Sequence, residues 1–170
     1  MFGNNLLRIT RAVAGDSVSA QMPVPASQGT GVQFLSTDRT QYALANGTRG
    51  FLLEHDVLDP VTYAAMILKD DVFMDNLVPP IKQGLEVTAR KVEEAELEGD
   101  MGLVQTSGTG AISSATPVSE ATTGTPTELG YINGLIALRQ AGSELAGWLR
   151  GIQPVQNPAN SVRILVEFAV

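Results

Sequence analysis

Residues 161–170 read Ser-Val-Arg-Ile-Leu-Val-Glu-Phe-Ala-Val and carry the clearest secondary-structure signal in the chain. Every second side chain is apolar, while Arg163 and Glu167 occupy alternate positions. The apolar positions are Val162, Ile164, Val166, Phe168 and Val170. Because successive side chains of a strand point to opposite faces, this period of two predicts a β-strand with one buried face.

Turn signals divide the sequence that leads to this strand. Asn133-Gly134 lies between two apolar runs and is the strongest short signal for a β-hairpin. A second reversal at residues 141–143 separates the apolar runs 135–139 and 145–149, and residues 113–128 form a polar loop rich in Ser and Thr. Short strands between closely spaced turns predict a small β-barrel or sandwich.

Two segments are compatible with either helix or strand. Residues 61–78 fit one helix or two short strands, because their periodicity favours neither. Residues 85–98 contain good helix formers but also alternate as a strand does, provided that a bulge or bend lies near Val92. The dense turns that follow favour strands. We therefore expect a mainly β fold with at most one or two short helices.

The start of the sequence differs from the rest. Residues 1–35 are predicted to form an extended N-terminal arm, and residues 36–170 a β-rich body. Pro23 and Pro25 favour extended backbone, and their surroundings are small and polar. Composition leaves two states of the arm open, namely docking on a partner and plain disorder.

Composition excludes several classes of protein. The chain has 170 residues, a net charge of -7 and no cysteine. Clustered Lys and Arg are needed to bind nucleic acid, and cysteines are needed for disulfides and thiolate sites. Apolar runs are shorter than a membrane span, so we expect a soluble chain without a leader. Only 17% of residues are charged, against about a quarter in typical domains, which suggests a surface partly covered by a partner.

A catalytic site is not apparent among the reactive residues. His55 is the only histidine, and its neighbours Glu54 and Asp56 would point away from it on a strand. The sequence lacks the G-x-S-x-G motif of a serine hydrolase, and one imidazole cannot build a His-rich metal site. We interpret His55 as a surface or packing residue.

The acidic residues and one glycine-rich stretch are weaker candidates for a functional site. Asp70, Asp71 and Asp75 with the glutamates of residues 93–98 could bind a hard cation, but no EF-hand loop is present. A solvated row of charges is the simpler interpretation. Residues 107–110 lack the lysine of a phosphate-binding loop and are interpreted as a turn. The sequence therefore predicts neither an enzyme nor a cofactor.

From residue 45 to residue 170 the chain shows a series of turn and strand motifs. They are residues 48–52, 84–90, 94–99, 108–112, 133–134, 138–142 and 160–167. In these motifs the chain resembles the small cement, or decoration, proteins on the heads of tailed bacteriophages. The resemblance implies a non-enzymatic β-barrel or sandwich that binds the outside of the capsid, bridges major capsid protein subunits and stabilises the head.

The same resemblance implies a place in the virion, on the capsid exterior, after synthesis in the host cytoplasm. Nucleic acid and membrane are not expected as partners, and a homo-oligomer, dimer or trimer, is left open. From composition alone we add a capsid-binding hypothesis for the arm. Leu6, Leu7 and Ile9 would be its apolar anchors, and Arg8 and Arg11 would pair with acidic capsid groups.

Two other classes of function remain open at this point. One is another virion assembly component, such as a tail-tube or head-fibre protein, which would polymerise on its own. The other is a small β-barrel hydrolase or ligand carrier, which would need a deep pocket around His55.

Overall fold

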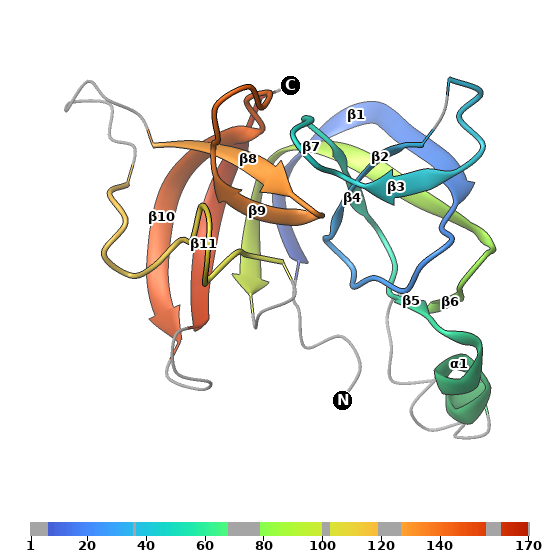
Figure 1. Ribbon diagram of the computed structural model, residues 1–170. Coiled ribbons are helices and arrows are strands. Elements are labelled where there is room, and N and C mark those ends of the chain that lie inside the picture. Colours follow the sequence, from blue (N-terminus) through green and yellow to red (C-terminus); the bar gives the residue numbers. More distant parts are fainter. Residues whose placement is uncertain are drawn as a thin grey trace.

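The computed structural model describes residues 7–35, 37–67, 79–99, 103–118, 127–155 and 161–169. They form eleven strands and one short helix (Figure 1), which confirms the predicted mainly β fold. The elements are β1 (Leu7–Gln21), β2 (Gly31–Phe34), β3 (Tyr42–Leu44), β4 (Phe51–Leu53), β5 (Val57–Leu58), α1 (Pro60–Ile67), β6 (Ile81–Lys82), β7 (Glu86–Gly99), β8 (Glu128–Ile132), β9 (Leu135–Leu138), β10 (Gly147–Val155) and β11 (Ser161–Phe168).

The long strand β7 organises the main sheet. Strand β1 pairs antiparallel along one edge of β7, from Leu97 to Glu86. The opposite edge is shared by two strands, because β4 pairs with residues 89–90 and β11 with residues 94–99. The sheet order is β3-β2-β4-β7-β11-β10-β8-β9, and β5 and β6 form a small parallel pair beside it. One strand pair thus passes through the whole molecule.

The half of the sheet that holds β2, β3 and β4 curls around its own core (Figure 1). Its strands run in the order β1-β7-β4-β2-β3 and return to β1, where Gln21 forms a bridge with Gln41. We call this half, together with α1, β5 and β6, the first lobe. Its buried residues are Ala20, Met22, Val32, Tyr42, Leu53, Val57, Val87 and Ala89.

The other half, the second lobe, contains the end of β7 with β11, β10, β8 and β9. The segment 103–112 closes it, because Val104 forms a bridge with Ile136 of β9. Its larger core includes Val92, Ala95, Leu97, Leu103, Ile112, Leu129, Tyr131, Ile136, Leu149, Val162, Ile164, Val166 and Phe168. The predicted alternation of the last strand is confirmed, since its even-numbered residues 162–168 are buried.

The ambiguous segment 85–98 is a strand, with an irregularity where one was expected. In the register of β1 and β7, Arg11 faces Glu94 and Ala12 faces Val92, so Glu93 is an extra residue on β7. Val92 and Ala95 on either side of it are both buried. The bulge allows one strand to keep its apolar residues inside across both lobes.

The other ambiguous segment begins with the helix α1. Asp59 caps it, because one Asp59 carboxylate oxygen accepts hydrogen bonds from the N–H groups of Val61 and Thr62 at 3.1 and 2.9 Å. These bonds lower the pKa of Asp59. The helix covers residues 60–67, and residues 68–78 lie outside the described part of the chain.

The structure contains two Asn-Gly turns, at Asn133-Gly134 and at Asn46-Gly47. Asn133 (φ 47°) and Gly134 (φ 85°) connect β8 to β9 as a two-residue hairpin, which is the predicted reversal. Gly47 (φ 72°) lies in the turn between β3 and β4. Positive φ is accessible to Asn and Gly, so these residues fix the two turns.

Tyr42 ties the strands of the first lobe together. Its hydroxyl lies 3.1 Å from both the Val18 carbonyl of β1 and the Val87 carbonyl of β7. Tyr42 is fully buried, and this burial raises the pKa of its hydroxyl to about 12. The neutral hydroxyl is therefore the form that the fold requires.

We expect the substitution Tyr42→Phe to lower the free energy of unfolding by about 1–2 kcal/mol, because the two carbonyls lose their donor. The Tyr42 pKa is higher in the folded than in the unfolded chain. Its stabilising effect is thus complete below pH 10 and is lost as the pH rises to 12. Urea unfolding at pH 8 and pH 11 measures this. We expect the rise from pH 8 to pH 11 to destabilise the wild type more than the variant. If it lowered the free energy of unfolding of both proteins by the same amount, the assignment would be wrong.

Candidate functional site

The structure places the predicted capsid-binding residues in or next to β1. Leu6 lies outside the described residues. Leu7 and Arg8 pair with residues 97 and 96 of β7. Ile9 packs against the core of the second lobe, and the Arg11 guanidinium lies 3.2 Å from the Glu94 carboxylate of the same chain. Ile9 and Arg11 therefore have partners within the molecule.

The predicted arm thus contributes strands to the sheet. Residues 7–21 lie along β7, and residues 31–34 form β2 in the first lobe. Ala20 and Met22 belong to the first core. Removal of residues 1–20 would remove a sheet strand, so a deletion that tests docking has to end before Leu7. The capsid contact itself stays a prediction.

His55 lies apart from its acidic neighbours. Its Nδ1 atom is 3.0 Å from the Pro79 carbonyl oxygen. Glu54 forms an ion pair with Arg90 of β7, and the Asp56 carboxylate accepts a hydrogen bond from the backbone of residue 28. The side chains that could orient a catalytic imidazole are therefore occupied by other contacts.

The acidic residues do not gather into a metal site in the described part of the chain. There, no group of three or more His, Cys, Asp or Glu side chains is placed to hold an ion. Glu93 and Glu94 lie beside Arg11, and Asp70, Asp71 and Asp75 lie outside the described residues. The glycines of residues 107–110 both have positive φ, as the turn interpretation requires.

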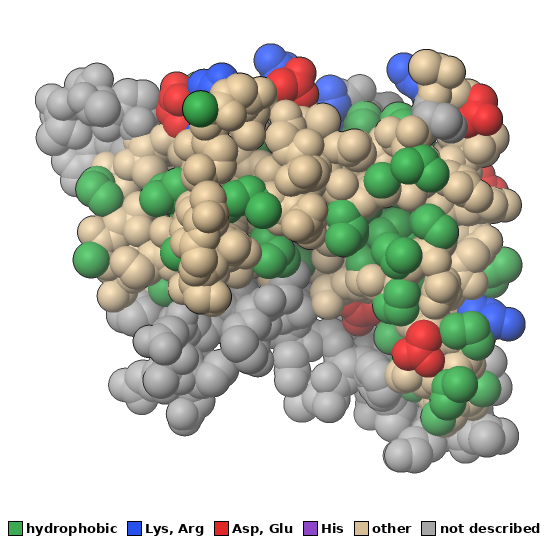
Figure 2. Space-filling view, in the orientation of Figure 1, with side chains coloured by type: hydrophobic (Ala, Val, Ile, Leu, Met, Phe, Trp, Pro, Cys, Tyr) green, Lys and Arg blue, Asp and Glu red, His purple; other side chains and the backbone are tan. Residues whose placement is uncertain are grey.

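The large apolar side chains that the structure describes as exposed all lie on the first lobe. Val24 is 40% exposed, Leu35 59%, Val61 80% and Leu85 54%, and we call these four the apolar group. A backbone hydrogen bond of 3.2 Å from Met22 to Leu85 brings the segment that carries Val24 to the start of β7. Figure 2 shows a band of hydrophobic side chains over this lobe and α1.

The two lobes meet where the β8–β9 hairpin lies against the turn after β3. The Gly31 N–H donates to the Gly134 carbonyl at 2.9 Å, and the Gly134 N–H donates to the Ala45 carbonyl at 2.7 Å. The Gly47 N–H donates to the Tyr131 carbonyl at 2.9 Å. These three backbone hydrogen bonds, which we call the junction, hold the two lobes together.

Tyr131 of β8 inserts its ring into the first lobe at the junction. A Cβ added to Gly31 would lie 2.6 Å from Cδ1 of the ring, and one added to Gly50 would lie 3.1 Å from Cε2. The ring thus fills space that is open because Gly31 and Gly50 have no side chains. Burial raises the pKa of Tyr131 above its usual range.

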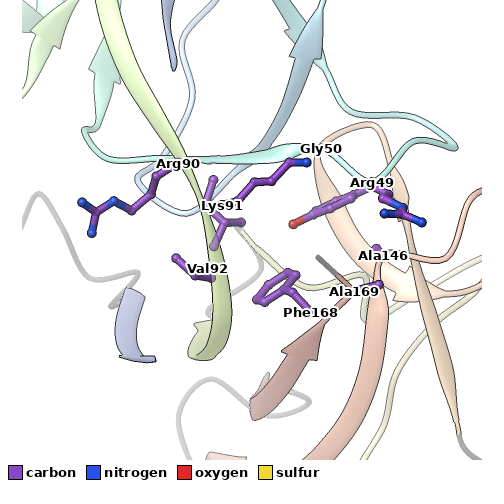
Figure 3. Close-up of a pocket in the computed structure, with 10 residues that line it drawn as sticks. Arg49, Gly50, Arg90, Lys91, Val92, Ala146, Phe168 and Ala169 are labelled. Carbon is purple, nitrogen blue, oxygen red and sulfur yellow. The ribbon is translucent and has the colours of Figure 1, made fainter. Parts of the chain in front are cut away.

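A small cavity of about 10 Å³ opens beside this ring (Figure 3). Its lining comes from both lobes and comprises Arg49, Gly50, Leu52, Arg90, Lys91, Val92, Tyr131, Ala146, Phe168 and Ala169. In Figure 3 the Lys91 side chain reaches toward Gly50, whereas the Arg90 guanidinium points away from the cavity. Sequence reasoning missed this site, because its residues come from five separate parts of the chain.

The comparisons with known proteins add no relative: no family model matches the chain, and neither the curated proteins nor the solved structures yield a match. In the described residues no helix is both long and apolar enough to cross a membrane. The functional argument therefore depends on the sequence motifs and on the surfaces described above.

Proposed function

We propose that this protein is a non-enzymatic structural component of a bacteriophage virion that binds the outer surface of the capsid. It bridges subunits of the major capsid protein and stabilises the assembled head. A protein that binds only the assembled lattice stabilises that lattice by mass action, and repetition over a symmetric shell strengthens modest contacts.

The observation that carries this proposal is the exposed apolar group on a body with little charge. Leu35, Val61 and Leu85 are each more than half exposed, and they share one lobe. Only 17% of the chain is charged. The segments that carry Val24 and Leu85 are joined by the hydrogen bond from Met22 to Leu85, and adjoining exposed apolar side chains are typical of protein–protein contact surfaces. Support also comes from the resemblance of residues 45–170 to capsid cement proteins.

Strand β1 supplies a second contact surface in this proposal. In the described residues β1 forms a ladder only with β7, apart from the bridge at Gln21. Over most of the other edge of β1, no strand of the described residues is paired with it. A strand edge of this kind can pair with an extended segment of a neighbour.

We expect the purified protein to sediment with capsids that lack it and to raise their heat stability. The substitutions Val24→Glu and Leu85→Glu place charge in the apolar group. We expect the double variant to show at least tenfold lower capsid occupancy at limiting concentration. This corresponds to a loss of about 1.4 kcal/mol in binding free energy. Occupancy is measured by sedimentation, and heat stability by release of DNA on heating.

Ser107→Glu combined with Thr109→Glu is the matched control, because the two substitutions add the same two charges at exposed positions of the second lobe. Removal of residues 1–6 tests Leu6 without removing β1. If the wild type fails to bind capsids, the proposal is wrong. Polymerisation of the isolated chain would instead indicate a tail-tube or head-fibre component, and turnover of a substrate would indicate a hydrolase.

A further inference from the structure

The Tyr131 hydroxyl is a buried polar group whose hydrogen-bonding capacity is unused. Tyr131 is only 2% exposed. Among the described residues, no side-chain or backbone group forms a hydrogen bond with its hydroxyl. A buried donor without a partner is costly, so such groups are usually satisfied by a protein atom, a water or an ion. Tyr131 also lines the junction cavity, which offers a place for that partner.

The cavity limits what the partner can be. Its volume of about 10 Å³ gives room for about one water-sized group. Leu52, Val92 and Phe168 supply apolar walls. A polyatomic anion such as phosphate does not fit this space. Lys91 is a long, flexible, half-buried side chain in the cavity lining. It can shift to admit a single atom that is larger than the oxygen of a water molecule.

The charges around the cavity favour an anion. Three of its ten lining residues are cationic and none is acidic, although the chain as a whole has a net charge of -7. Arg90 is neutralised by its ion pair with Glu54. The Arg49 side chain is exposed, and the Arg49 backbone N–H donates to the Glu144 carboxylate at 3.1 Å, so a negative charge lies beside it. Lys91 remains, and its ammonium lies 5.4 Å from the centre of the Phe51 ring.

Apolar walls also discriminate among anions. Transfer of an ion out of water costs more for a small, strongly hydrated ion than for a large one of the same charge. Among monatomic anions this disfavours fluoride and favours chloride or bromide. A neutral phenol that donates one hydrogen bond, with positive charge nearby, suits such an ion.

We propose that the junction cavity binds one halide ion, chloride under physiological conditions, which accepts a hydrogen bond from the Tyr131 hydroxyl and is held by the charge of Lys91. The ion joins the two lobes, because Tyr131 comes from β8 and Lys91 from β7. This proposal is independent of capsid binding and goes beyond it.

The first test compares thermal unfolding in sodium chloride and in sodium gluconate at equal ionic strength. Because a ligand that binds only the folded state stabilises it, we expect a melting temperature about 2–4 °C higher in saturating chloride. Tyr131→Phe removes only the hydroxyl, and Lys91→Met removes the ammonium. We expect both to abolish the chloride-specific difference, while Tyr63→Phe, the matched control on α1, keeps it.

The second test places the ion directly. Crystals of the wild-type protein grown in bromide should show an anomalous peak within hydrogen-bond distance of the Tyr131 Oη atom. A water at this position, or an empty cavity, would overturn the proposal even if the Tyr131→Phe variant failed to fold. Equal melting temperatures in chloride and gluconate would also overturn it, because a bromide peak would then represent binding at crystal concentration only.

Discussion

We expect the substitution Gly31→Ala to lower the free energy of unfolding by about 3 kcal/mol or more, a large part of the stability of a typical domain. The new Cβ would overlap the ring of Tyr131, with Cδ1 at 2.6 Å and Cζ at 2.7 Å. The ring cannot turn aside, since Gly50 lies on its other side. Gly31 cannot retreat either, because its backbone is bonded to Ala45 and Gly134. Urea unfolding followed by circular dichroism measures the loss.

The control for this prediction is Gly130→Ala, a strand glycine beside Tyr131 whose added Cβ would have its nearest contact at 3.4 Å. We expect a change of less than about 1 kcal/mol there. Tyr131→Ala removes the ring, so Gly31→Ala should cost much less in that background, as expected for residues in direct contact. Full stability of Gly31→Ala in the wild-type background would show that the ring does not occupy this space.

The second large effect is expected at Gly147, the first residue of β10. An added Cβ would collide with the backbone carbonyl oxygen of Glu167 and would lie 3.0 Å from Cα of Phe168. Backbone atoms of a paired strand cannot give way as a side chain can. We expect Gly147→Ala to separate β10 from β11 and to cost about 3 kcal/mol or more in thermal or urea unfolding.

Gly151→Ala is the matched control on the same strand. Its added Cβ would lie 3.3 Å from Cβ of Leu165, a close contact that a shift of a few tenths of an ångström relieves. We expect a loss of about 1 kcal/mol or less. Hydrogen exchange of β10 and β11 amides distinguishes the two variants, because only Gly147→Ala should expose them. Similar effects of both substitutions would contradict this explanation.

The sequence predicted those strands and turns that depend on residues close together in the chain. The alternation that ends at Phe168 and the turn at Asn133-Gly134 each lie within a few residues, and both are confirmed. The segment 85–98 was harder, because the extra residue Glu93 breaks the period of two and mimics a helical pattern. Only pairing with β1 and β11 decides in favour of a strand.

The sequence did not reveal that the N-terminal residues form a strand of the sheet. Leu7 and Ile9 alternate with polar residues, and so do Val18 and Ala20, but the pairing between these stretches is irregular. Between Ala12 and residue 17, β1 has more residues than the facing part of β7. This interruption hides a strand within a sequence that reads as an arm.

The candidate sites depend on contacts that no local pattern reveals. Tyr131 reads as an ordinary core residue, and the significance of Gly31 and Gly50 emerges only when the ring lies between them. The exposed positions of Val24 and Leu85 likewise follow from the way the first lobe curls. Sequence patterns specify faces and turns, whereas cavities and surface groups require the tertiary arrangement.

The shared pair of β1 and β7 has a mechanical consequence. These strands contribute to both cores, and their register shifts between Ile9 and Ser17, where the pair passes from one lobe to the other. Tension applied across the molecule along this pair would load its ladder in shear, with many backbone bonds resisting together rather than one at a time. The shared strand pair therefore resists a pull that would separate the two lobes along its length.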